Sequence, residues 1–193
     1  MKKLILKSVL IIFVSVTLFS CSKDDDGPNY QEENFLEGYL SSTDFNQKVT
    51  DYINSGSYEF GLEFTPLVNG VITSIRVELP DTNPSLKVTI WDKEAGTVLK
   101  TEIVNVASAN TVYNFDIVDL DLTKNKEYTI TMNSDDWYKR EKTDGINATY
   151  PITVGNIKIN NYKWGSGNLQ IYPGNKSLNY FAGDISFNFK QTE

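Results

Sequence analysis

From about residue 57 onward the sequence repeats one pattern, in which apolar side chains occupy every second position and short polar turns interrupt the runs. In one run Ile75 and Val77 alternate with polar residues, and a turn at 80–84 ends the run. This period of two is that of a β-strand with one buried and one exposed face. No long stretch of the region has the 3.6-residue period of an amphipathic helix. We expect strands at residues 71–79, 86–91, 99–103, 113–117, 128–132 and 181–189.

Repeated short strands of this kind predict an all-β fold, namely a single antiparallel β-sandwich of the jelly-roll or immunoglobulin-like type. We place this domain at residues 56–193. A domain of this length buries about two-thirds of the surface of its extended chain, which is enough for one hydrophobic core. The only cysteine is Cys21, so the core forms without an intrachain disulfide.

The first 20 residues have the features of a signal peptide. Three lysines precede an apolar stretch from Val9 to Phe19, which is shorter than the ~20 apolar residues that span a bilayer. The stretch ends in Leu18-Phe19-Ser20-Cys21, which resembles the lipobox of bacterial lipoproteins, although Phe19 is bulkier than usual. We expect residues 1–20 to be removed and Cys21 to carry lipid that anchors the protein in the outer membrane. The alternative is an ordinary secretory peptide followed by an unmodified cysteine.

A short acidic cluster follows the expected lipid anchor. Asp24, Asp25 and Asp26 lie directly behind Cys21, and this arrangement resembles the surface-export signal of Bacteroidetes lipoproteins. The resemblance implies that the protein faces the cell exterior; the alternative is a solvated run of charge. The polar composition of residues 21–55 is typical of a flexible tether, within which a short helix near 43–53 or a first edge strand is compatible with the sequence.

Composition excludes several kinds of chemistry. The chain has no histidine, which excludes Ser-His-Asp and Cys-His catalysis and every metal site with imidazole ligands. A net charge of −7 argues against a nucleic-acid partner, because such partners require basic surfaces.

Five motifs between Phe60 and Met132 form a recognisable series: GLEFTP at 61–66, NGVITSIR at 69–76, VTIWD at 88–92, GTVL at 96–99 and LTKNKEY at 122–128. The segment that contains them resembles the DUF4082 family, a β-sandwich domain of bacterial surface and secreted proteins. Asn125 stands where a glycine is commoner in the family, and it tolerates similar turn conformations. No activity is assigned to the family, although it occurs beside carbohydrate-handling modules; this association says little about function on its own.

The stretch 133–180 is rich in aromatic side chains interleaved with asparagine, glycine, lysine and serine. Flat aromatic rings beside amide and hydroxyl groups bind sugars, because a ring covers the C–H face of a pyranose while the polar groups bond its hydroxyls. Tyrosine, serine, glycine and asparagine also dominate protein-recognition loops. The alternative is that these rings fill the ends of the sandwich. The candidate ligand-binding residues are Trp137, Tyr138, Tyr162, Trp164 and Tyr172.

Two groups of oxygen-bearing side chains are candidate Ca²⁺ ligands: Asp116, Asp119 and Asp121, and Asn133, Asp135 and Asp136. Neither group has the spacing of an EF-hand, so ordinary loop acids are the alternative, and we expect no other cofactor. Lys139, Arg140 and Lys142 form either a solvated turn or an anion site, and the sequence favours the turn.

These observations predict a non-catalytic surface lipoprotein whose β-sandwich binds an extracellular ligand, with a glycan as the first choice. One alternative is a structural, adhesive or accessory module that docks a partner protein. A third is a glycoside-processing enzyme, which needs two carboxylates ~5–9.5 Å apart across a cleft. No pair of acids in the sequence is singled out for that role.

Overall fold

The computed structural model describes residues 28–43, 45, 48–143 and 150–193. Cys21, the expected signal peptide and the acidic cluster lie outside the described residues. The described elements are β1 (Glu32–Asn34), α1 (Leu36–Thr43), β2 (Lys48–Tyr52), β3 (Tyr58–Pro66), β4 (Gly70–Glu78), β5 (Asn83–Asp92), β6 (Thr97–Val106), β7 (Tyr113–Leu122), β8 (Tyr128–Ser134), β9 (Trp137–Glu141), β10 (Ile152–Val154), β11 (Ile157–Ser166), β12 (Asn175–Ser177), β13 (Tyr180–Ala182) and β14 (Asp184–Gln191).

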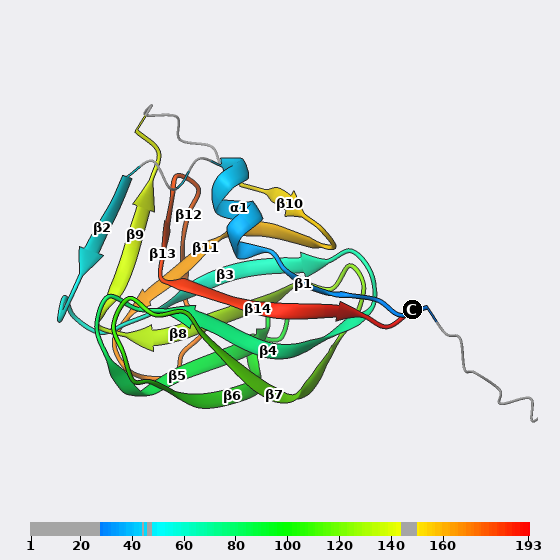
Figure 1. The fold of residues 1–193 in the computed structure, drawn as a ribbon, viewed down its shortest axis with the longest axis horizontal. Coiled ribbons are helices and arrows are strands. Elements are labelled where there is room, and N and C mark those ends of the chain that lie inside the picture. Colours follow the sequence, from blue (N-terminus) through cyan, green and yellow to red (C-terminus); the bar gives the residue numbers. More distant parts are fainter. Residues whose placement is uncertain (1–27, 44, 46–47, 144–149) are drawn as a thin grey trace, which may run out of the picture.

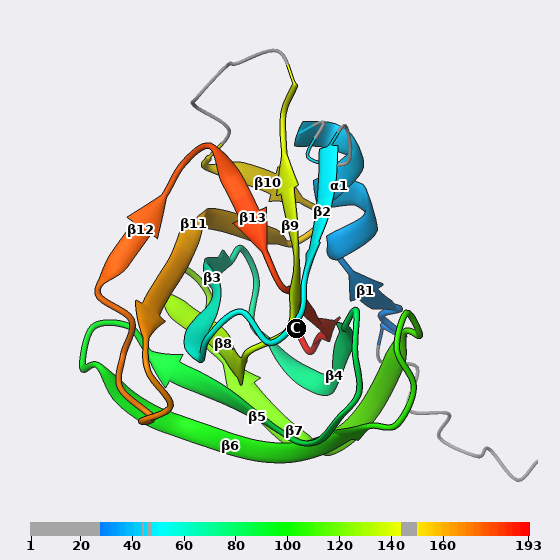
Figure 2. The ribbon, with the colours of Figure 1, turned by 90° about the vertical axis from the view of Figure 1, so that its left-hand side faces the viewer.

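The strands form an antiparallel β-sandwich, which confirms the fold class predicted from the sequence. A four-stranded sheet has the order β1-β14-β4-β7, and it faces a larger sheet with the order β10-β11-β3-β8-β5-β6, in which β12 also pairs with β11. A third, three-stranded sheet has the order β13-β9-β2. Its strands β2 and β9 stand at one end of the molecule, at the left of Figure 1, and Figure 2 shows them from that end.

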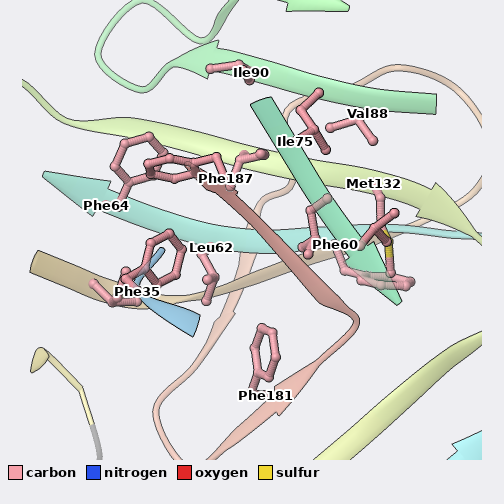
Figure 3. Close-up of a cluster of buried hydrophobic side chains, with 14 of the residues drawn as sticks. Phe35, Phe60, Leu62, Phe64, Ile75, Val88, Ile90, Met132, Phe181 and Phe187 are labelled. Atoms are coloured by element: carbon pink, nitrogen blue, oxygen red, sulfur yellow. The ribbon is translucent and has the colours of Figure 1, made fainter. Parts of the chain in front are cut away.

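The hydrophobic core fills the space between the two larger sheets (Figure 3). Alternation along β3 and β14 places Phe64 and Phe187 in contact across it, with ring centroids 4.6 Å apart. Phe35, just ahead of α1, joins them with an edge-to-face contact at 4.9 Å to Phe187. Burial of one such side chain is worth ~1.5–3 kcal/mol, so these buried rings contribute substantially to the stability of the core.

The segment before residue 56 contributes three elements to this fold. Strand β1 pairs with β14 at the edge of the four-stranded sheet, and Asn34 caps α1 by accepting a hydrogen bond from the backbone N–H of Leu36 (3.1 Å). Behind this cap, Tyr39 and Phe45 are fully buried in the core. Among the described residues the one helix lies at Leu36–Thr43, ahead of the range 43–53 considered for it, and residues 48–52 form a strand.

The apolar run at 181–189, expected as one strand, is divided into β13 and β14 by Gly183. Gly183 has φ +76°, and a β-carbon there would lie 2.2 Å from Cε2 of Phe60. Only glycine fits both constraints. The break passes the chain from the three-stranded sheet to the four-stranded sheet, so it sets the position of the small sheet relative to the sandwich. Asn125 adopts the left-handed conformation that its place in the turn requires, with φ 64°.

Candidate functional site

An aromatic hollow lies where the three-stranded sheet meets β3 and β11 of the large sheet. Its volume is about 240 Å³. Among the described residues that line it, seven are aromatic and one is charged. We use the name aromatic hollow for the space enclosed by Tyr52, Tyr58, Phe60, Trp137, Lys139, Tyr162, Trp164, Tyr180 and Ala182.

Strand register brings these rings together from distant parts of the chain. In the small sheet Tyr52 of β2 is the direct partner of Trp137 of β9. In the large sheet Trp164 of β11 is the partner of Phe60 of β3. Because partners in adjacent strands point to the same face, each sheet presents a pair of neighbouring rings to the hollow.

Trp137 packs against three other aromatic rings of the hollow. Its indole stacks on Tyr52 with centroids 5.2 Å apart and an interplanar angle of 8°. Tyr58 and Phe60 meet it edge-on at 5.3 and 5.4 Å. Trp164 has one ring neighbour among the described residues, Tyr58 at 6.4 Å, and is half-buried. The hollow therefore contains one indole packed against three rings, that of Trp137, and one packed against a single ring, that of Trp164. Both indoles are partly exposed.

The charged residue of the hollow, Lys139, is held by two contacts. Its Nζ lies 5.0 Å from the ring centroid of Tyr180 and 2.8 Å from Oε1 of Glu141. The hydrogen bond from Lys139 lowers the pKa of Glu141, against a smaller opposing effect of burial. Lys48 approaches the other oxygen of Glu141 at 3.4 Å. This edge of the hollow thus offers ammonium and phenol groups beside the rings.

Three of the five candidate ligand-binding residues line this hollow: Trp137, Tyr162 and Trp164. Of these, Tyr162 is buried in the core, and the two tryptophans are partly exposed. Tyr138 does not, because it follows Trp137 in the same strand and faces the other way. It is buried and donates a hydrogen bond to Oδ1 of Asn110 (2.5 Å). Burial, with smaller contributions from nearby carboxylates such as Glu78, raises the pKa of Tyr138 to about 12.

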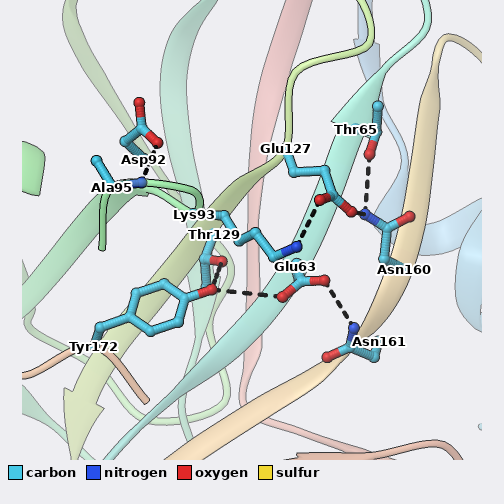
Figure 4. Close-up of polar contacts among 10 residues, drawn as sticks. All are labelled: Glu63, Thr65, Asp92, Lys93, Ala95, Glu127, Thr129, Asn160, Asn161 and Tyr172. Carbon is cyan, nitrogen blue, oxygen red and sulfur yellow. Dashed lines mark hydrogen bonds and ion pairs between the residues drawn. The ribbon is translucent and has the colours of Figure 1, made fainter. Parts of the chain in front are cut away.

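Tyr172 belongs to a separate polar layer on the opposite face of the large sheet, which Figure 4 shows. Its hydroxyl lies 3.0 Å from Oγ1 of Thr129 and donates a long hydrogen bond of 3.5 Å to Glu63. Glu63 in turn accepts a hydrogen bond from Asn161 (3.0 Å). The Tyr172 ring meets Trp91 edge-on at 5.7 Å, and Trp91 is buried. Tyr172 therefore covers the outer face of the large sheet and does not line the aromatic hollow.

Sequence reasoning missed the other residues of the hollow to different degrees. Tyr180 ends the aromatic-rich stretch 133–180 but is not among the five candidates, whereas Tyr52 and Tyr58 lie outside that stretch, near the start of the fold. No local pattern connects Tyr52 with Tyr180, because the contact between their strands depends on the pairing of β2 with β9 and of β13 with β9.

The acidic groups considered for Ca²⁺ do not converge. Asp116, Asp119 and Asp121 are exposed along β7. Asp136 is buried and accepts a hydrogen bond from the backbone N–H of Asn54 (2.8 Å), which is a turn contact. In the described part of the chain, no group of three or more acidic, cysteine or histidine side chains is arranged to hold a metal ion.

The expected turn at Lys139 and Arg140 is wrong, because both residues lie inside β9. Pairing with β2 on one side and β13 on the other keeps this segment extended. Alternation along the strand sends Lys139 into the aromatic hollow and Arg140 to the other face.

Within the described ranges, no helix is long and apolar enough to cross a bilayer. No family model matches the chain, and no curated protein is significantly similar to it. The likeness to the DUF4082 family therefore depends only on the motifs at residues 61–128.

Proposed function

We propose that the protein is a non-catalytic lipoprotein of the cell surface that binds a glycan in the aromatic hollow. The observation that carries the proposal is the convergence of seven aromatic side chains from five strands on one partly open space of about 240 Å³. Two of the seven rings, Phe60 and Tyr162, are buried in the core, and the other five are partly exposed. Partly exposed aromatic rings that share one hollow are typical of ligand sites.

The chemistry of the hollow supports a sugar. Trp137 and Trp164 supply flat apolar faces, which suit the C–H face of a pyranose. Lys139 and the phenol groups supply the hydrogen bonds that orient a hydroxylated ligand. The lipid anchor at Cys21 and the acidic cluster behind it would hold this hollow outside the cell, where polysaccharides are available.

Tryptophan fluorescence tests the proposal directly, because two of the three tryptophans line the hollow and the third, Trp91, is buried elsewhere. In a Trp91→Phe background, all tryptophan emission comes from the hollow. We expect soluble polysaccharides or their oligosaccharides to change this emission saturably.

Trp164→Ala is the informative variant, because Trp164 has few ring contacts and its loss should leave the fold intact. We expect at least tenfold weaker binding, equivalent to ~1.4 kcal/mol. Tyr113→Ala is the matched control: Tyr113 is a half-buried ring that stacks on Phe115 of β7, outside the hollow. Equal binding by Trp164→Ala and wild type, or no response to any polysaccharide, would reject the proposal.

A further inference from the structure

We propose that a second hollow, on the outer side of the four-stranded sheet, binds a small ligand in which a carboxylate adjoins a hydrogen-bond donor. This site is separate from the aromatic hollow, and the inference does not depend on glycan binding there. Its volume is about 320 Å³, and we call it the arginine hollow. Its lining residues are Asn34, Leu36, Glu37, Leu40, Arg76, Val77, Glu78, Val112, Arg140 and Asp184.

The arginine hollow collects both arginines of the sequence. Arg76 comes from β4 and Arg140 from β9, and the chain has no other arginine among its 18 basic residues. Guanidinium groups bind carboxylates in a planar two-point geometry that lysine cannot reproduce. Their meeting in one hollow of an acidic protein therefore points to recognition of an anionic group.

One side of the hollow is fixed by a buried ion pair. Arg140 donates from Nε to Oδ1 of Asp184 at 3.0 Å and from Nη2 to Oδ2 at 2.5 Å. Asp184 is 3% exposed, so this pair is held rigidly under the hollow. An arginine has five N–H donors, and within the described chain only two of those of Arg140 have an acceptor. The remaining donors are available to a ligand.

The other side of the hollow has two groups without direct partners. Among the described residues, neither the guanidinium of Arg76 nor the carboxylate of Glu78 forms a hydrogen bond or an ion pair. They lie two residues apart on one face of β4, a separation of ~6.6 Å along a strand. Burial, and then the charge of Asp184, raise the pKa of Glu78, against smaller lowering effects of the charges of Arg140 and Arg76. A hydrogen bond donated by a ligand would stabilise the ionised carboxylate further.

The mixed charge of the lining selects the class of ligand. Two guanidinium groups are accompanied by Glu37, Glu78 and Asp184, so a simple anion would meet repulsion as well as attraction. A ligand with a carboxylate for Arg76 and a neighbouring hydroxyl or ammonium for Glu78 satisfies both groups. Sugar acids and amino acids share this chemistry. The side chains of Leu36, Leu40 and Val112 would contact the apolar part of either.

Isothermal titration calorimetry tests the inference with two probes: sodium glucuronate, whose donor is a hydroxyl, and L-serine, whose donor is an ammonium. Glucose lacks the carboxylate and acetate lacks the donor, so both serve as negative probes. The test variant is Arg76→Gln. Lys190→Gln is the matched control, because it removes a half-buried cation from the neighbouring strand of the same sheet, outside the hollow. Circular dichroism checks that both variants are folded.

We expect saturable binding of at least one probe and no binding of glucose or acetate. Binding should weaken at least tenfold in Arg76→Gln and remain within twofold of wild type in Lys190→Gln and in Trp164→Ala. Glucuronate binding alone would identify a sugar acid, and serine binding alone an amino acid. The inference is overturned if neither probe binds, or if Arg76→Gln binds as tightly as wild type. Unchanged binding in Trp164→Ala would show that the probe binds in the arginine hollow and not in the aromatic hollow, so this test does not depend on whether the aromatic hollow binds a glycan.

Discussion

The ion pair between Arg140 and Asp184 gives the sharpest prediction about stability. Arg140→Met keeps an apolar stem of similar length and removes both charge-assisted hydrogen bonds to Asp184. The side chain of Arg140 is 17% exposed and that of Asp184 only 3%. Loss of one partner therefore leaves a carboxylate with almost no access to water. Breaking a buried pair in this way costs about 3–5 kcal/mol, and we expect a loss in that range at pH 7.

The loss should depend on pH. Burial raises the pKa of Asp184 above 3.8 even with the opposing hydrogen bond and charge of Arg140. Without Arg140 the pKa of Asp184 in the folded state should rise further. The neutral carboxyl is then favoured in the folded state, so the variant loses stability as pH rises through that raised pKa. Acidification below it should bring the variant back toward wild type.

Urea unfolding followed by tryptophan fluorescence measures both effects, at neutral pH and at a series of acidic values. The double variant Arg140→Met/Asp184→Leu is the control, because it removes both charges and should be more stable than Arg140→Met alone. A loss below about 1 kcal/mol at pH 7, or a loss of equal size at all pH values, would refute the reasoning.

Three further predictions concern single side chains. Burial raises the pKa of Glu59 above 4.5, so its ionisation disfavours the folded state. We therefore expect Glu59→Gln to be more stable than wild type at pH 7 and equally stable below pH 4.5. Thermal unfolding at several pH values checks this, and a pH-independent difference would contradict it. Gly183→Ala should cost about 2–4 kcal/mol, since the new methyl group would lie 2.2 Å from Phe60 at a positive φ; an unchanged urea midpoint would show that the junction adapts. Tyr138→Phe should cost about 1 kcal/mol through the lost hydrogen bond to Asn110, and it should remove from an alkaline absorbance titration one tyrosine with a pKa of about 12.

The sandwich could be predicted from the sequence because alternation is a local property. Runs such as 71–79 and 113–117 contain their own period, and the structure places strands at each of them. Trp91, out of phase with its neighbours Val88 and Ile90, lies under Tyr172 on the opposite face of its sheet. This position also follows from the period of two.

The site could be predicted only in part. Tyr162 and Trp164 are two residues apart, so they face the same side, whereas adjacent Trp137 and Tyr138 must face opposite sides. Alternation alone is therefore sufficient to separate Trp137 from Tyr138. The partnership of Tyr52 with Trp137 could not be found in this way, because it depends on which distant strands pair and in what register.

The segment around α1 shows a different limit. Its composition is polar and its apolar residues are few, which is why the sequence predicts a tether there. Phe35, Tyr39 and Phe45 nevertheless take part in the core. The average composition of a segment does not show whether its few aromatic residues are spaced so that they pack into a core formed by distant strands.

Strand β9 lies between the aromatic hollow and the arginine hollow and lines both. Trp137 and Lys139 project from one of its faces into the aromatic hollow, while Arg140 projects from the other into the arginine hollow. A shift or twist of this five-residue strand would displace groups in both spaces together. If a molecule in either space moves β9, thermodynamic reciprocity requires each occupant to alter the affinity of the other by the same factor. Strand β9 thus contributes side chains to both hollows, and a displacement of it is the route by which an occupant of one would affect the other.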